Sequence, residues 1–213
     1  MKYCTFIYGK EWHEKFAANI VKECKSHDIY ILTNMPEYFK GCEFVEEYTR
    51  PVFSYYEKLN WVLKLSKELK QRVTFVDADW VFNLTQGLEN IDEEQIYTYR
   101  ILQMSVLTDR KMLIDLFESA DYPWNDDDYI PEGVISMPYL PDILDNVIAD
   151  IEYLQPFWEN TFTQETKVTK ILKRYTKFGI GYAEGGALTA VAHKYGIKYS
   201  ARKKLIRRND LLI

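Results

Sequence analysis

The chain has 213 residues, of which 47% are hydrophobic and 28% charged, and its formal net charge is -5. A chain of this length can bury one substantial core, so we expect a single domain over residues 1–213 rather than two independent units. The mildly acidic balance gives no support for a nucleic-acid or membrane-surface partner.

Cysteine spacing and hydropathy indicate the compartment. The three cysteines, Cys4, Cys24 and Cys42, form no CxxC pair, which argues against a zinc site or a disulfide framework. The amino terminus has no signal-peptide core, and no later stretch approaches the roughly 20 apolar residues that span a bilayer. We therefore predict a reduced, cytoplasmic protein without a membrane span. The abrupt end at Ile213 leads us to expect a domain excised from a longer protein.

In chain order, short β-branched and aromatic runs alternate with amphipathic segments. The runs predict strands over residues 3–8, 29–33, 44–48, 73–76, 96–99 and 134–137. The amphipathic segments between them predict helices over residues 12–25, 55–69 and 109–120. This βαβ alternation predicts an α/β fold, with a central, mostly parallel sheet covered by helices.

The second half of the chain is more helical. Helices are predicted over residues 141–157 and 164–174, and a last helix follows a glycine-rich turn and ends at Tyr195. We expect this part to pack onto the sheet rather than to extend it. A basic tail over residues 202–208 follows.

The predicted strand at residues 73–76 runs directly into two carboxylates, Asp77 and Asp79. Alternate residues of an extended chain point to the same side, so both can address one point at the carboxyl edge of the sheet, where open α/β sheets bind ligands. Two carboxylates leave positions on Mg²⁺ or Mn²⁺ for water and substrate phosphates. The pattern therefore predicts a metal held by Asp77 and Asp79 with a bound diphosphate, and a solvated loop is the simple alternative.

The segment before this strand, Tyr-Tyr-Glu-Lys-Leu-Asn-Trp at residues 55–61, carries a resemblance. Together with Asp77-Ala78-Asp79 it resembles the metal-dependent GT-A glycosyltransferases, in which a helix with a basic residue precedes a DxD strand. The resemblance implies a GT-A α/β/α sandwich, a UDP-sugar donor, and Mn²⁺ or Mg²⁺ as the cofactor. It also implies that Lys58 lies near the nucleotide or its phosphates. A solvent-facing helix charge is the alternative for Lys58.

The resemblance extends to other contacts with the nucleotide sugar. It implies contacts from Thr5 and Tyr8 at the end of the first strand, with Tyr8 against the uracil, and from Ala78 beside the two carboxylates. It further implies that Gly133 approaches the donor sugar and that Arg202 in the basic tail closes over the diphosphate. The residues alone allow simpler interpretations: a core tyrosine, a turn before a strand and a solvated surface.

Two acidic segments are candidates for catalysis. Glu184-Gly-Gly-Ala-Leu-Thr resembles the acidic family motif that opens a helix beneath the donor sugar, which implies a retaining reaction in which Glu184 stabilises the anomeric centre. A helix cap is the alternative for Glu184. An inverting enzyme would need a carboxylate base, and the candidates are then Glu184 and the loop acids Asp126, Asp127 and Asp128.

The predicted function is transfer of a hexosyl group, glucose or a 6-deoxyhexose such as rhamnose, from a UDP-sugar to a glycan or glycoprotein acceptor. Within the family, the chain is similar to the amino-terminal domain of a large multidomain glycosyltransferase encoded by chlorella viruses, which implies a viral capsid glycan as acceptor and the host cytoplasm as location. Two alternatives stay open. One is a haloacid-dehalogenase-like phosphatase with Asp77 as its nucleophile, and the other is a non-catalytic nucleotide-binding module of the same fold.

Overall fold

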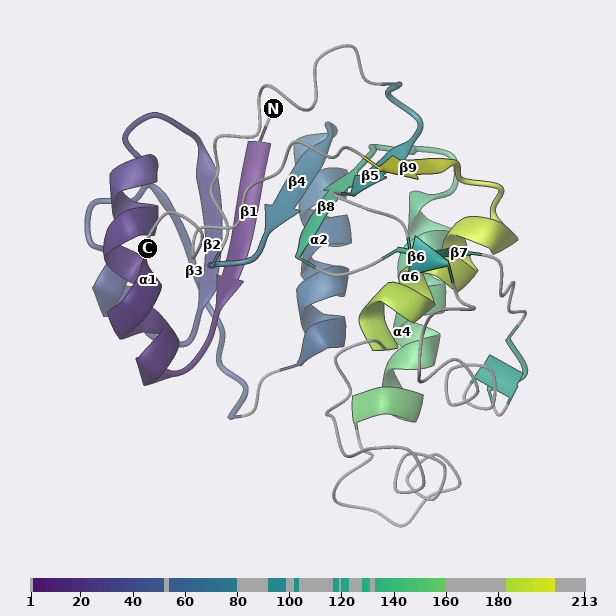
Figure 1. Ribbon diagram of the computed structural model, residues 1–213, viewed down its shortest axis with the longest axis horizontal. Helices are drawn as coiled ribbons and strands as arrows, with labels where there is room; N and C mark the ends of the chain where they lie inside the picture. The colour runs from purple at the N-terminus through teal and green to yellow at the C-terminus, as the bar shows by residue number, and fades with distance from the viewer. Residues whose placement is uncertain are drawn as a thin grey trace.

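The computed structural model describes residues 2–51, 54–79, 92–98, 102–103, 117–118, 120–122, 128–130, 133–159 and 183–201. Their main feature is a seven-stranded sheet in the order β3-β2-β1-β4-β8-β5-β9 (Figure 1). Its strands are β1 (Lys2–Ile7), β2 (Ile29–Thr33), β3 (Phe44–Glu47), β4 (Val73–Val76), β5 (Ile96–Thr98), β8 (Val134–Met137) and β9 (Tyr199–Ala201). A separate two-stranded sheet pairs β6 (Leu102–Gln103) with β7 (Asp128–Tyr129).

Six strands of the main sheet run in one direction, and β8 alone among them runs against its neighbours β4 and β5. The mostly parallel α/β sheet expected from the sequence is therefore confirmed. The chain moves outward from β1 to β2 and β3, and then returns to the other side of β1 as β4. This reversal makes the carboxyl ends of β1 and β4 a topological switch point, where open α/β sheets bind ligands.

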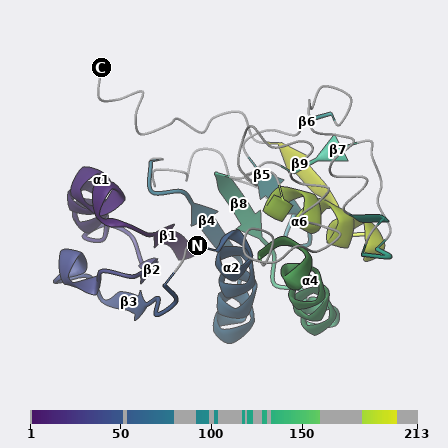
Figure 2. The same cartoon turned by 90° about the horizontal axis from the view of Figure 1, so that it is seen from below.

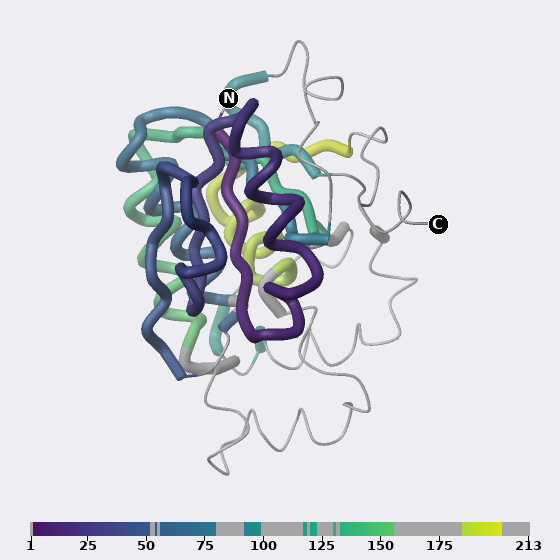
Figure 3. Tube along the Cα trace, turned by 90° about the vertical axis from the view of Figure 1, so that its left-hand side faces the viewer, coloured from purple at the N-terminus to yellow at the C-terminus, as the bar shows by residue number. Residues whose placement is uncertain are grey.

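Helices cover both faces of the sheet (Figures 2 and 3). On one face, α2 (Tyr55–Leu69), α4 (Leu144–Glu159) and α6 (Ala183–Lys194) share a core with the inward side chains of β1, β4, β5 and β8. On the opposite face, α1 (Lys10–Glu23) and the short 3₁₀ helix η1 (Pro36–Phe39) share a second core with β1 and β2. Helices pack on both faces because the strands carry apolar side chains on both sides of the sheet.

The helix α2 shows how local sequence fixes an element. Its buried residues Tyr56, Leu59, Val62 and Leu63 recur at helical spacing and face the sheet. Ser54 is the N-cap, and its hydroxyl accepts a hydrogen bond from the Glu57 backbone N–H at 3.0 Å. Because serine followed three residues later by glutamate is a capping-box pattern, the start of this helix is encoded locally.

All six predicted strands are confirmed to within one residue. The helices differ more at their ends, since α1 begins at Lys10, directly after Gly9, and α4 begins at Leu144, after a turn at residues 141–143. The expectation that the second half would not extend the sheet was wrong, because β9 adds an edge strand beside β5. The predicted helix at residues 164–174, and most of the one at 109–120, lie outside the described residues. Within the part of the chain that is described, we find no helix long and apolar enough to cross a membrane.

Candidate functional site

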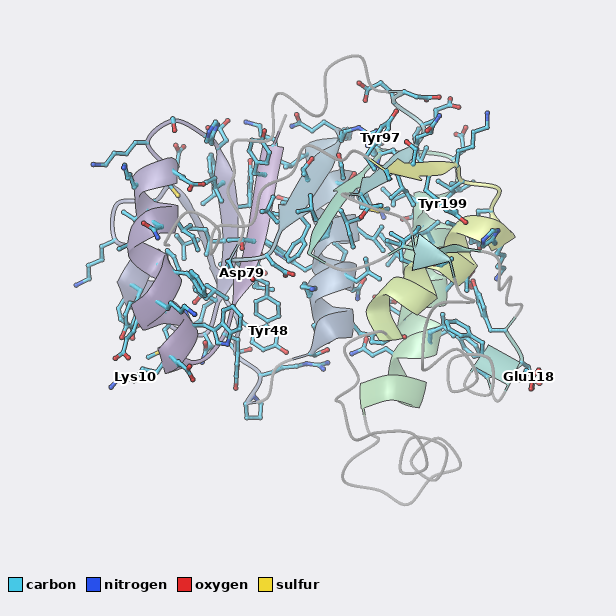
Figure 4. All side chains as sticks on the ribbon, in the orientation of Figure 1. Lys10, Tyr48, Asp79, Tyr97, Glu118 and Tyr199 are labelled. Carbon is cyan, nitrogen blue, oxygen red and sulfur yellow. The ribbon has the colours of Figure 1, made fainter. Side chains whose placement is uncertain are left out.

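The candidate site lies where β1 and β4 end side by side. The register of these parallel strands places Cys4 beside Phe75, so the turn after β1 and the carboxylates after β4 emerge at the same edge of the sheet. Figure 4 labels Asp79 at this edge, with Tyr48 at the same end of the sheet. The edge coincides with the topological switch point, so the strand order itself favours ligand binding here.

The two carboxylates and the residue between them differ in burial. The side chain of Asp77 is 33% exposed and Asp79 is half-buried, whereas Ala78 is 3% exposed and packs into the core on the α1 face. The two acids are therefore accessible while the methyl group of Ala78 faces inward. The predicted contact of Ala78 with a ligand is thus limited to its backbone.

Gly133 couples the start of β8 to the carboxylates. The backbone N–H of Asp77 donates a hydrogen bond to the Gly133 carbonyl at 2.8 Å, because antiparallel β8 begins beside the end of β4. Gly133 is buried and has a φ of 108°, a conformation that residues with a Cβ rarely adopt. The structure therefore brings Gly133 next to Asp77, as expected for a shared site, and the positive φ explains why glycine stands there.

Lys58 lies beneath the carboxylates rather than in solvent. Its side chain is 5% exposed, and its ammonium lies 3.5 Å from Asp77 Oδ1 and 4.7 Å from the centre of the Phe75 ring. The charge of Lys58 also acts on the buried Cys4 thiol, where it opposes the effect of burial, which raises the pKa of that thiol. The solvent-facing alternative for Lys58 is therefore wrong.

Hydrogen bonds connect the turn after β1 to the residues at the end of β2. Gly9 has a φ of 86°, and its N–H donates to Asn34 Oδ1 at 3.0 Å. The buried His13 donates from Nδ1 to the Gly9 carbonyl at 2.7 Å, since a carbonyl can only accept, and its Nε2 then accepts from the Thr33 hydroxyl at 2.6 Å. Sequence reasoning missed Asn34 and His13, although a polar residue directly after a predicted strand is a usable signal.

This arrangement suits a neutral histidine. Burial lowers the pKa of His13 below its ordinary value, and the hydrogen bond to Gly9 opposes the shift only in part. In the unfolded chain His13 takes up its proton at about pH 6.5, so stability is complete above that pH and is lost as the pH falls toward the lower folded pKa. We expect His13→Gln to remove this pH dependence, because a glutamine amide does not titrate.

The measurement is urea denaturation between about pH 7.5 and pH 5.5, a window that spans the unfolded pKa. His27→Gln is the matched control, because it removes a histidine outside this hydrogen-bonded turn and should keep the wild-type slope of stability against pH. Equal slopes for wild type and His13→Gln would show that His13 does not carry the dependence.

An aromatic cluster borders the same edge. The Tyr8 ring lies 5.9 Å from the Tyr48 ring in an edge-on arrangement, and Tyr48 packs 4.8 Å from Phe6. The Tyr8 hydroxyl donates to the Pro51 carbonyl at 2.6 Å, and its side chain is half-buried. Tyr8 is therefore not a fully buried core tyrosine, and part of its ring remains accessible at the site. Sequence reasoning missed Tyr48, which is brought here by β3.

Thr5 and Asp128 lie elsewhere. Thr5 is within β1, and its side chain is fully buried, so the structure gives its hydroxyl no access to the site edge. Asp128 belongs to β7, which lies beyond the β9 edge of the main sheet, whereas Asp77 follows β4 in the middle of the sheet (Figures 1 and 2). The predicted roles of both residues receive no support from these positions.

The structure gives the position of Glu184 along α6 but does not describe Arg202. Glu184 is the second residue of α6, in its first turn, and α6 begins toward the end of the sheet that carries Asp79 (Figures 1 and 4). Arg202 follows β9 and lies outside the described residues, as do Asp126 and Asp127. The predicted roles of Glu184 and Arg202 therefore stay predictions.

The donor set at the β4 end fits a hard divalent cation in part. Among the described residues, no group of three or more histidine, cysteine, aspartate or glutamate side chains is arranged to hold a metal ion. Asp77 and Asp79 offer accessible carboxylate oxygens, which suit Mg²⁺ or Mn²⁺ and leave most of the coordination shell to other oxygen ligands. A site with this composition is suited to a cation that arrives together with a phosphate-bearing ligand.

No protein-family model and no curated protein sequence matches the chain. Among the solved structures that are similar to the chain, two that match 94% of it are glycosyltransferases. The glycosyltransferase GlyE of Streptococcus pneumoniae TIGR4 is 10% identical with a TM-score of 0.45, and this chain spans 44% of its length. The galactosyltransferase LgtC, in complex with donor and acceptor sugar analogues, is 12% identical with a TM-score of 0.48, and the chain spans 73% of it. At these values no residue role is transferred, and a function must be inferred from the residues at the end of β4.

Proposed function

We propose that the protein is a glycosyltransferase that binds a nucleoside diphosphate sugar through a divalent cation held by Asp77 and Asp79. The observation that carries the proposal is the pair of accessible carboxylates at the β1/β4 switch point, beside the buried ammonium of Lys58. A lone acidic pair is a common surface feature. An acidic pair at the carboxyl end of a central strand, fixed to Gly133 through the Asp77 N–H, is a built position at which open α/β sheets bind ligands.

The residues around the pair support a nucleotide as the ligand. Tyr8 offers a partly accessible ring on the β1 side of the carboxylates, suited to contact a base such as uracil. The helix α1 begins directly after β1, so its amino terminus lies at the same edge and favours anions. These elements therefore suit a nucleotide whose base contacts Tyr8 and whose diphosphate lies at the two carboxylates.

In the reaction, the bond between the anomeric carbon of the sugar and the diphosphate oxygen breaks. The oxygen of an acceptor hydroxyl forms the new glycosidic bond, and its proton passes to the departing diphosphate or to a carboxylate base. Asp77 and Asp79 would hold Mn²⁺ or Mg²⁺, which as a Lewis acid neutralises the charge that develops on the departing diphosphate. Glu184 is the proposed carboxylate for stabilising the anomeric centre, and it would be the base if the reaction were inverting. We propose a hexosyl donor and a glycan acceptor, with a retaining outcome.

The test is hydrolysis and transfer with a panel of UDP-sugars, including UDP-glucose and a UDP-6-deoxyhexose, in the presence of Mn²⁺. Release of UDP from one donor, dependent on Mn²⁺, is the expected result, and the stereochemistry of the released sugar decides between retention and inversion. Release of phosphate from aryl phosphates without UDP binding would favour a phosphatase with Asp77 as nucleophile. Metal-dependent UDP binding with no turnover would identify a binding module.

A further inference from the structure

Lys58 is a charged group in an apolar setting. A small cavity adjoins it, lined by Leu59, Val62, Phe75 and Ile135. Its side chain is 5% exposed, and like Tyr56 it is buried on α2. An ammonium is costly to bury in such surroundings unless an opposite charge compensates it, and Asp77 at 3.5 Å provides that charge.

The burial of Lys58 limits what it can contact. Its ammonium lies over the Phe75 ring and its side chain is 5% exposed, whereas the Asp77 side chain is 33% exposed. A ligand that reaches Asp77 from solvent therefore meets the carboxylate before the ammonium. This order favours an electrostatic effect through Asp77 over a direct contact of Lys58 with phosphate.

We propose that Lys58 is a positioning residue whose buried ammonium is the fixed counter-charge of Asp77, so that it weakens binding of a free divalent cation and strengthens binding of a nucleoside diphosphate. This inference rests on the proposed function of the same site. With Lys58 in place, the positive charge beside Asp77 opposes a free divalent cation. A nucleoside diphosphate brings negative charge that Lys58 attracts, so Lys58 shifts the preference of the site from a free cation toward the diphosphate.

The test is calorimetric titration of Mn²⁺ alone and of UDP with saturating Mn²⁺, on wild type and Lys58→Met. Methionine fills the space over the Phe75 ring without charge. We expect Mn²⁺ alone to bind Lys58→Met about tenfold more tightly, since the positive charge beside Asp77 is removed in a partly solvated site. The affinity for UDP should fall, because the attraction of Lys58 for the diphosphate is lost. A merely structural role for Lys58 would not tighten cation binding.

Lys64→Met is the matched control, because Lys64 lies on the same helix, is 54% exposed and pairs with Glu152. It should bind Mn²⁺ and UDP as wild type does. Should thermal unfolding show that Lys58→Met is not folded, Lys58→Gln removes the same charge and takes its place. Unchanged or weaker Mn²⁺ binding by Lys58→Met would overturn the inference, and weaker UDP binding in that case would make Lys58 a phosphate ligand. Absence of any Mn²⁺-dependent UDP binding to wild type would instead overturn the proposed function itself.

Discussion

Replacing Asp79 with asparagine is expected to abolish Mn²⁺-dependent binding of UDP. A carboxylate at about 2.2 Å from a divalent ion contributes several kcal/mol even at a water-like dielectric, so we expect the affinity for UDP with Mn²⁺ to fall by roughly 100-fold or more. The amide is nearly isosteric and Asp79 is half-buried at a turn, so the fold should persist. Calorimetric titration of UDP with and without Mn²⁺ measures the effect.

Asp28→Asn is the matched control for this substitution. Asp28 precedes β2 at the opposite edge of the sheet and pairs with Lys2, so the variant makes the same change in charge far from the site. It should bind UDP with wild-type affinity. Two outcomes would contradict a metal site at Asp77 and Asp79: equal UDP affinity with and without Mn²⁺ in the wild type, or unchanged UDP binding by Asp79→Asn. The phosphatase hypothesis would then be tested first.

Local patterns explain why β4 and its carboxylates could be predicted from the sequence. The run at residues 73–76 is apolar and β-favouring, and Asp77 ends it because an unpaired charge is not tolerated within a buried strand. The position of such a strand end at the edge of a parallel sheet follows from the βαβ alternation. The helix α2 was predicted over residues 55–69 from its amphipathic pattern, and the structure adds that Ser54 and Glu57 cap its start.

Features that depend on distant parts of the chain could not be predicted. Lys58 lies against Phe75 of β4 and lines one cavity with Ile135 of β8, so its burial depends on strands outside α2. Helical periodicity places Lys58 beside the apolar stripe but does not say how far the sheet reaches over it. The hydrogen bond from Thr33 to His13 likewise joins β2 to α1, and neither residue alone signals it.

Neither the direction of β8 nor the short edge strand β9 could be predicted from local sequence patterns. The antiparallel direction of β8 is defined by its pairing with β4 and β5, and its own residues would suit either direction. The strand β9 has three residues, all half-buried, so it carries neither a long apolar run nor a clear alternation. Its pairing with β5 alone makes it a strand.

Replacing Phe75 with alanine is expected to produce the largest loss of stability of the substitutions considered. Phe75 is 1% exposed in the central strand β4, where it packs against Cys4 on β1 and Ile135 on β8 and supports the Lys58 ammonium. Truncation of a buried phenylalanine costs about 3–5 kcal/mol, which for a chain of this size lowers the midpoint of thermal unfolding by roughly 10 °C. Trp12→Ala is the control, because Trp12 is 48% exposed and its loss should cost about 1 kcal/mol or less. Thermal unfolding followed by circular dichroism measures both, and similar midpoints for the two variants would contradict the placement of Phe75 at the centre of the core that supports the site.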